Sequence, residues 1–179
     1  MEFRNRTAVD RKTHCRSNGI STTYIHKHLK VGDLLAINGP YGNAFRSEGS
    51  DNIVLIAGGS GMSPVKSILV DLAAKKDKRK IRYFFGAKAL RDLFLLDLMH
   101  ELEKNLSCFT FIPALSEPMA GDNWPGEAGL ITEVVDRHLV DIDGVEAYLC
   151  GSPLMIDACV DVLKAKGLPE EKIHFDKFT

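Results

Sequence analysis

Short apolar runs alternate with amphipathic segments from residue 52 to the end of the chain. Residues 52–57, Asn-Ile-Val-Leu-Ile-Ala, form a continuous apolar run that ends in glycines, which is typical of a strand buried on both faces. Residues 64–76 instead space their apolar side chains as one face of a helix does. The predicted strands are residues 52–57, 81–85, 107–114, 146–150 and 172–176. The predicted helices are residues 64–76, 93–104, 129–135 and 153–166.

This alternation of strand and helix predicts an α/β fold with a doubly wound, five-stranded parallel sheet and right-handed crossovers. Residues 1–49 read differently, because they hold turn signals and one alternating segment, residues 34–38. They predict a small β unit, too short for an ordinary independent domain. We therefore place a boundary between residues 1–49 and 50–179, in the polar run Ser-Glu-Gly-Ser-Asp.

Composition narrows the class of protein. With 45% hydrophobic and 26% charged residues, the balance is that of a soluble globular protein. A net charge of −1 gives no reason to expect nucleic acid or an acidic membrane surface as a partner. The polar start of the chain predicts neither a signal peptide nor a membrane span.

Cysteine and histidine spacing predicts no metal site. The four cysteines form no C-x-x-C pair and are predicted to be reduced, which favours a cytoplasmic location. His26 and His28 do not share a helix face, and His14 and Cys15 supply no specified fourth ligand.

The turn after the first predicted strand is the main candidate site. Gly61 would let the main chain approach a phosphate closely, and the following helix start favours an anion. Pro64 suits the first helical turn, where its missing N–H costs nothing. The alternative is a glycine-rich turn with no ligand. The candidate residues are Gly58, Gly59, Ser60, Gly61, Met62, Ser63 and Pro64.

This G-G-S-G-x-x-P turn resembles the NAD(P)-binding half of the ferredoxin–NADP reductase superfamily. Three further family motifs follow in order. They are Phe84–Ala87 with Arg91–Phe94, Ala114–Pro118 with Asp122–Trp124 and the later Gly126 and Gly129, and Cys150–Pro153. Together they look most like the FAD/NAD subunit of sodium-pumping NADH:quinone reductases and the reductase components of bacterial oxygenases. The resemblance covers roughly the last 160 residues.

The resemblance implies a role for each motif. Residues 59–64 would bind the pyrophosphate of NAD(P)H, and Cys150 would lie near the nicotinamide and shape hydride transfer. The alternative for Cys150 is a small buried hydrophobic residue. Phe178 would shield the flavin ring or, alternatively, cover the edge of the core. The other nucleotide-binding residues that the resemblance implies are Gly86, Ala87, Arg91, Asp92, Gly151, Ser152, Pro153 and Met155.

A flavin site is implied only in part. Residues 19–26 resemble the family's flavin-pyrophosphate turn, and residues 1–49 would be part of its antiparallel β-barrel. The implied FAD-binding residues are Gly19, Ser21, Thr22, Thr23, Gly39, Pro40, Tyr41 and Gly42. The family's R-x-Y-S/T strand has no counterpart in this chain. The chain would then be a fragment, a subunit whose barrel a second chain completes, or a remnant that no longer binds FAD.

The implied function is that of a reductase component. Hydride would pass from NAD(P)H to FAD, and electrons would go on to a separate protein or to an iron–sulfur or quinone-linked subunit. It would work in the cytoplasm or at the cytoplasmic face of a membrane complex. The alternative is a non-catalytic NAD(P)-binding or regulatory subunit. The resemblance favours NADH, whereas Lys88, Arg91 and the basic run 75–80 leave NADPH open.

Overall fold

The computed structural model describes residues 19–36, residue 49 and residues 51–177. These residues fall into two units, one holding residues 19–36 and the other holding the rest. In the smaller unit the described residues form one helix, α1 (Ile20–Lys27), followed by a turn. In that turn the N–H of Lys30 donates to the Asp33 carboxylate at 2.8 Å, and Gly32 has a φ of +101°.

The larger unit is built on a parallel sheet with the strand order β4-β3-β2-β1-β5-β6. Every pairing is parallel, as the continuous apolar runs predict. The five predicted strands are confirmed. The sixth, β4, pairs only with Ala114 and Leu115 and is too short to leave a sequence pattern. The strands are β1 (Asn52–Gly58), β2 (Ile81–Ala87), β3 (Phe109–Leu115), β4 (Glu127–Ala128), β5 (Val145–Gly151) and β6 (Ile173–Lys177).

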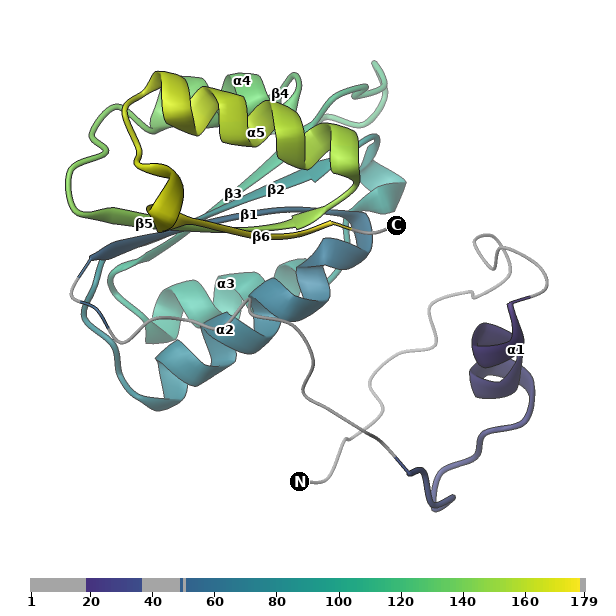
Figure 1. The fold of residues 1–179 in the computed structure, drawn as a ribbon. Helices are drawn as coiled ribbons and strands as arrows, with labels where there is room; N and C mark the ends of the chain where they lie inside the picture. The colour runs from purple at the N-terminus through teal and green to yellow at the C-terminus, as the bar shows by residue number, and fades with distance from the viewer. Residues whose placement is uncertain (1–18, 37–48, 50, 178–179) are drawn as a thin grey trace. The chain divides into compact units, whose positions relative to one another are not determined.

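Two pairs of helices cover the sheet (Figure 1). Helices α2 (Met62–Ala74) and α3 (Leu96–Asn105) lie on one face, and α4 (Ile131–His138) and α5 (Pro153–Ala165) lie on the other. The short helices are η1 (Gly59–Gly61), η2 (Leu90–Asp92) and η3 (Glu170–Lys172). Strand β1 feeds both cores, because Leu55 belongs to the α2/α3 side and Ile56 to the α4/α5 side. This explains why its sequence shows no polar alternation.

Two glycines set helix boundaries. Gly167, with a φ of +96°, ends α5, and the N–H of Leu168 donates back to the Leu163 carbonyl at 3.0 Å, as a glycine stop predicts. Gly129, with a φ of +115°, lies before α4 rather than in it. The predicted helix start at residue 129 is therefore two residues early. The carboxylate of Glu133 accepts the Leu130 N–H at 2.9 Å and fixes the true start.

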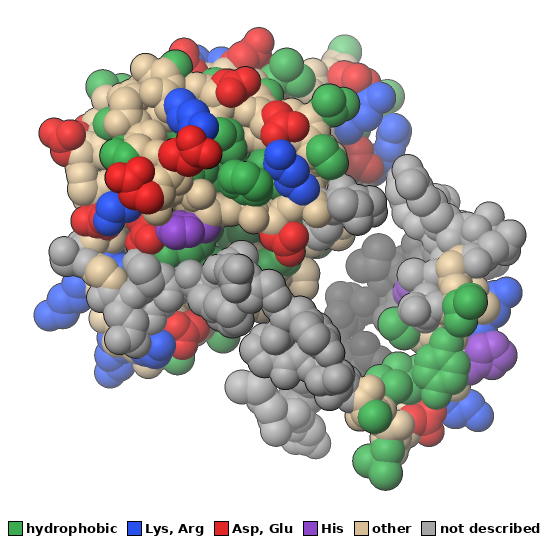
Figure 2. All heavy atoms as spheres, viewed as in Figure 1, with side chains coloured by type: hydrophobic (Ala, Val, Ile, Leu, Met, Phe, Trp, Pro, Cys, Tyr) green, Lys and Arg blue, Asp and Glu red, His purple; other side chains and the backbone are tan. Residues whose placement is uncertain are grey.

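The β-barrel part remains a prediction. Of the alternating segment 34–38, residues 34–36 form no strand, and residues 37 and 38 lie outside the described part. On the larger unit, acidic and basic side chains are interspersed over α4 and α5 (Figure 2), in keeping with the balanced charge of the sequence. Among the described residues, the helices lack the length and apolar character needed to cross a bilayer.

Candidate functional site

The strand order predicts a ligand-binding crevice at the carboxyl ends of β1 and β5. Strand β1 continues through α2, whereas its neighbour β5 continues through α5. These two helices lie on opposite faces of the sheet (Figure 1). Ligands of open parallel sheets bind in the crevice that such a divergence creates. The predicted turns 58–64 and 150–153 end these two strands, so the fold brings them to one place.

The turn after β1 is shaped to receive an anion. Gly59 is exposed, has a φ of +53°, and a Cβ added there would meet no atom within 4 Å. Helix α2 has no acidic residue in its first turn and no side-chain cap among the described residues. The N–H of Met62 already donates to the carbonyls of Gly59 and Ser60, so the candidate groups for binding a pyrophosphate oxygen are the N–H groups of η1 (Gly59–Gly61), which runs directly into α2. Pro64, the third residue of α2, removes none of the helix's internal hydrogen bonds.

Gly61, predicted to admit a phosphate, packs against the neighbouring strand β5. It is buried, and a Cβ at this position would overlap the carbonyl group of Cys150. The missing side chain therefore lets the start of α2 rest directly on the β5 backbone. This contact fixes the first turn against the second, and Gly59 is the glycine of this turn that faces open space.

The second turn begins where β5 ends. Gly151 is the last residue of β5, Ser152 precedes α5, and Pro153 is its first residue. Cys150 is 3% exposed, and its pKa is raised by burial and, secondarily, by the negative charge of Asp176. A buried thiol with a raised pKa is not a nucleophile at neutral pH. This state suits the non-covalent role expected of Cys150.

Met155 joins the two turns. A Cβ on Gly58 would lie 2.7 Å from the Met155 Sδ, and a Cβ on Gly151 would lie 2.6 Å from its Cε. The thioether side chain therefore packs across the ends of both strands, in the space that the two glycines leave open. The sequence gives no signal for this contact, because residues 58 and 155 lie far apart along the chain.

Strand β6 brings Asp176 beside Cys150. The two residues are register partners, and both line a pocket of about 30 Å³ with Pro64 and His174. Asp176 is exposed. No sequence motif predicts that Asp176 lies beside Cys150, because this depends on the register between β5 and β6.

A family model described as an oxidoreductase NAD-binding domain matches residues 55–161. The chain belongs to this family. The match spans β1 to most of α5 and includes both turns of the crevice. The resemblance drawn from the four motifs is thereby confirmed.

The relatives of this NAD-binding chain include proteins named as reductase components. It is 41% identical over 162 residues to the phenol hydroxylase P5 protein of Acinetobacter pittii, covering 89% of this chain and 46% of that protein. It is 41% identical over 157 residues to the reductase component of the propane 2-monooxygenase of Rhodococcus jostii, covering 84% and 42%. The ferredoxin reductase of carbazole 1,9a-dioxygenase superposes with a TM-score of 0.73 at 26% identity, covering 92% of this chain and 49% of that one. The chain spans about half the length of these relatives.

The end of β2 lies beside the end of β1, at the same edge of the sheet as the two turns. A Cβ on Gly86 would lie 3.0 Å from the Ile131 Cβ, so this glycine admits the start of α4. Asp92 accepts the Ala89 N–H at 3.1 Å and thereby closes the η2 turn, whereas Arg91 is exposed. Lys88 pairs with Glu117 at 3.3 Å, which joins the ends of β2 and β3. The role of Glu117 was not predicted, although it lies in a motif that the sequence displays.

The predicted flavin residues are only partly described. Gly19 precedes α1, whose first turn carries no acidic residue, so its first N–H groups are compatible with an anion. Ser21, Thr22 and Thr23 fall in that turn. Residues 39–42 and Phe178 lie outside the described part of the chain.

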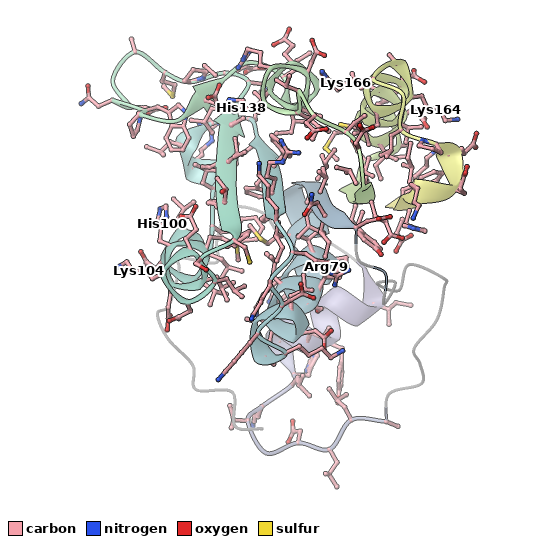
Figure 3. All side chains as sticks on the ribbon, turned by 90° about the vertical axis from the view of Figure 1, so that its left-hand side faces the viewer. Arg79, His100, Lys104, His138, Lys164 and Lys166 are labelled. Carbon is pink, nitrogen blue, oxygen red and sulfur yellow. The ribbon has the colours of Figure 1, made fainter. Side chains whose placement is uncertain are left out.

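The basic run 75–80 lies at the wrong edge for nucleotide binding. It connects the end of α2 to the start of β2, whereas the glycine turn is at the other end of the sheet. Figure 3 looks onto this opposite side, where Arg79 is labelled. Arg79 binds the Asp77 carboxylate at 2.7 Å and the Gly49 carbonyl at 2.6 Å. This placement removes one reason to expect a 2′-phosphate. Within the described residues, no three His, Cys, Asp or Glu side chains could hold a metal.

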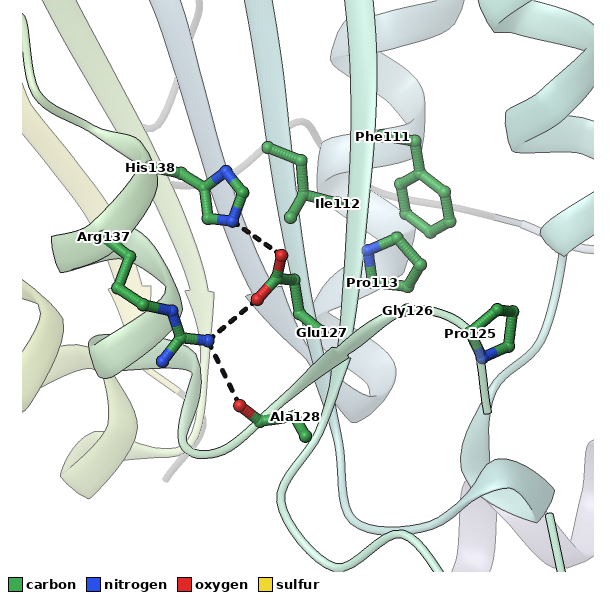
Figure 4. Close-up of a pocket in the computed structure, with 9 residues that line it drawn as sticks. All are labelled: Phe111, Ile112, Pro113, Pro125, Gly126, Glu127, Ala128, Arg137 and His138. Atoms are coloured by element: carbon green, nitrogen blue, oxygen red, sulfur yellow. Dashed lines mark hydrogen bonds and ion pairs between the residues drawn. The ribbon is translucent and has the colours of Figure 1, made fainter. Parts of the chain in front are cut away.

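A larger pocket, of about 450 Å³, lies away from the crevice. It is beside β4 at the outer edge of the sheet (Figure 4). Glu127 accepts hydrogen bonds from Arg137 at 2.8 Å and His138 at 2.7 Å, and these donors hold its pKa below the ordinary range of a glutamate. The charged groups of the pocket satisfy one another, and their evident role is to fasten the β3–α4 loop to the end of α4.

Replacing Glu127 by glutamine should lower the stability of the protein at neutral pH and leave its stability in acid unchanged. Because the folded-state pKa is depressed, the carboxylate stabilises the fold above its unfolded pKa. That contribution is lost as the pH falls through the folded pKa. We expect E127Q to be less stable by about 1 kcal/mol at pH 7, and the difference to vanish under acid conditions. Urea unfolding across pH measures it. If E127Q stays less stable than the parent by the same amount at low pH, the ionised Glu127 carboxylate is not the source of the stabilisation.

Proposed function

We propose that this chain is the nucleotide-binding part of an FAD-dependent NAD(P)H oxidoreductase that supplies electrons to a separate acceptor. The family assignment supports oxidoreductase chemistry, and the reductase names of the relatives support an electron-transfer role. One observation carries the proposal. Gly61 lies directly against the Cys150 carbonyl, which brings the exposed turn at Gly59 beside a buried thiol whose pKa is raised.

In this proposal the two turns divide the dinucleotide between them. The N–H groups of η1, which runs directly into α2, hold the pyrophosphate, with Ser60 and Ser63 as hydroxyl partners. Cys150, Gly151 and Ser152 wall the nicotinamide, with Met155 packed between the turns. FAD, when bound, supplies the group that accepts hydride and releases single electrons. The chain aligns the reactants and excludes water, and no side chain acts as an acid or base.

The remaining partners are proposals from the same resemblance. FAD would be held by residues 19–23 and 39–42, with Phe178 against the ring. A second chain or a further segment would complete the barrel. The acceptor would be a separate protein or an iron–sulfur or quinone-linked subunit. A cytoplasmic location is supported by free thiols at Cys108, Cys150 and Cys159.

Flavin retention tests the proposal against a non-catalytic nucleotide-binding subunit. The purified chain is mixed with FAD, passed over gel filtration and examined in the visible spectrum. We expect bound flavin that NADH bleaches under anaerobic conditions, together with NADH-dependent dye reduction. NADH binding without flavin or dye reduction would favour the non-catalytic subunit.

Glu117 should favour NADH over NADPH. The carboxylate neutralises Lys88 at the ends of β2 and β3, and it would repel a 2′-phosphate placed there. We expect Glu117→Gln to improve NADPH affinity relative to NADH by about tenfold, since it also frees Lys88. Calorimetric Kd values for both nucleotides give the ratio.

Glu170→Gln is the matched control for this experiment. Glu170 also pairs with a lysine, Lys164, at 2.7 Å, but it lies in η3 just before β6 begins, away from the crevice. The control should leave the nucleotide ratio unchanged. An unchanged ratio in the Glu117 variant as well would contradict the selectivity argument.

A further inference from the structure

The sheet of the larger unit has an outer edge that β4 covers only in part. Strand β4 pairs with Ala114 and Leu115, so residues 109–113 of β3 have no strand beyond them in the described structure. An uncovered edge strand is a template on which a second chain can pair.

The sequence of this edge makes such pairing a hazard. Residues 107–115, Ser-Cys-Phe-Thr-Phe-Ile-Pro-Ala-Leu, contain no charged residue and are rich in aromatic and β-branched side chains. This is close to the composition of segments that self-associate as strands, apart from its proline. Edge strands are commonly protected from pairing by charged side chains such as lysine, and this segment carries none.

The register identifies which backbone groups face outward. The Cys108 carbonyl accepts a bond from Ile81, and the Ser116 N–H donates to Ala87, so these residues face β2. The backbone N–H and C=O groups of successive residues point to opposite edges of a strand. Those of residues 109, 111, 113 and 115 therefore point away from β2. The bond from the Gly129 N–H to the Leu115 carbonyl at 2.9 Å agrees with this assignment.

None of the outward positions in residues 109–113 has an N–H group that is free to bond a second strand, and the reason differs at each position. The N–H of Phe109 donates to the Leu106 carbonyl at 3.0 Å in the preceding turn. The N–H of Phe111 donates to Oε1 of Glu103, on α3, at 2.7 Å. Residue 113 is proline and has no N–H. Over these five residues the edge therefore offers an incoming strand no donor.

Glu103 is itself held in place. Its second oxygen, Oε2, lies 3.0 Å from Nδ1 of His100, one turn earlier in α3. The His100 ring meets the Phe111 ring in an edge-on contact, with centroids 6.2 Å apart. Figure 3 shows His100 on α3, and Figure 4 shows Phe111 and Pro113 along the uncovered strand.

We infer that Glu103 and Pro113 together keep the β3 edge from adding a strand of a second copy of this chain. Glu103 acts as a latch, because its carboxylate occupies the Phe111 N–H that such a strand would use. The latch is independent of nucleotide binding, since it lies at the outer edge and the glycine turn follows β1. Its partner, when unlatched, is the same edge of another molecule, because that edge carries the same uncharged segment.

The test is the double variant Glu103→Ala with Pro113→Val, which restores two neighbouring outward donors. Sedimentation velocity over a concentration series compares it with the parent chain. We expect the average mass of the double variant to rise with concentration above that of the parent. Glu101→Ala, on the same helix, is the matched control and should follow the parent. A folded double variant that keeps the parent's association profile would overturn the inference.

Amide exchange supplies a second test that does not depend on the double variant folding. Glu103→Gln keeps an acceptor oxygen, whereas Glu103→Ala removes it. We expect the Phe111 N–H to exchange on the order of tenfold faster in the alanine variant and near the parent rate in the glutamine variant. Equal exchange in all three proteins would show that Glu103 does not hold the edge.

Discussion

Replacing Gly59 by valine is expected to weaken NADH binding by at least about 30-fold while the domain stays folded, an effect near 2 kcal/mol. A side chain at this position points into open space, so no contact within the protein is lost. It would, however, stand in the phosphate cradle that we propose at the η1 turn. Valine also disfavours the φ of +53°, at a cost of ~1–2 kcal/mol. Calorimetric titration with NADH measures the affinity, and circular dichroism checks the fold.

Gly167 provides a matched control for the strain. It too has a positive φ, of +96°, and open space where a Cβ would be added, but it ends α5 at the opposite edge of the sheet. Gly167→Val should therefore lose a similar amount of stability and keep the parent affinity for NADH. If both variants bind NADH as the parent does, the phosphate cradle is not at Gly59 and the proposed function loses its main support.

The sheet could be predicted from sequence because its signal is local. A strand such as 52–57 shows its burial on both faces directly in its residues, and Gly167 marks the end of α5. Strand β4 escapes prediction because it contributes only two residues, Glu127 and Ala128. A pairing that short is decided by the loop geometry around it.

In the candidate site, too, the local features could be predicted from the sequence and the long-range contacts could not. The motifs locate the turns at 58–64 and 150–153, because each has a glycine pattern between a strand and a helix. They do not reveal that Met155 packs against both turns, or that Asp176 stands beside Cys150. Those contacts depend on the sheet register and on helix packing, which join residues far apart in the chain.

The two glycines at positions 59 and 61 of one motif lie in different surroundings. Glycines 59 and 61 are two residues apart and look equivalent in the sequence, yet only Gly59 faces open space. Gly61 is buried, and its Cα lies against the carbonyl of Cys150. A backbone carbonyl cannot move aside as a flexible side chain can, and this one belongs to the β5 strand that pairs with β1.

Gly61→Ala is therefore expected to cost the fold itself, by about 4 kcal/mol, which for a unit of this size lowers the Tm by roughly 10 °C. Thermal unfolding followed by circular dichroism measures the loss. Gly121→Ala is the control, since a Cβ there meets nothing within 4 Å and the change should leave the Tm near the parent value. A Gly61 variant with the parent Tm would mean that α2 does not rest on β5 in solution. The two halves of the crevice would then be independent, and NADH affinity would no longer report on both turns at once.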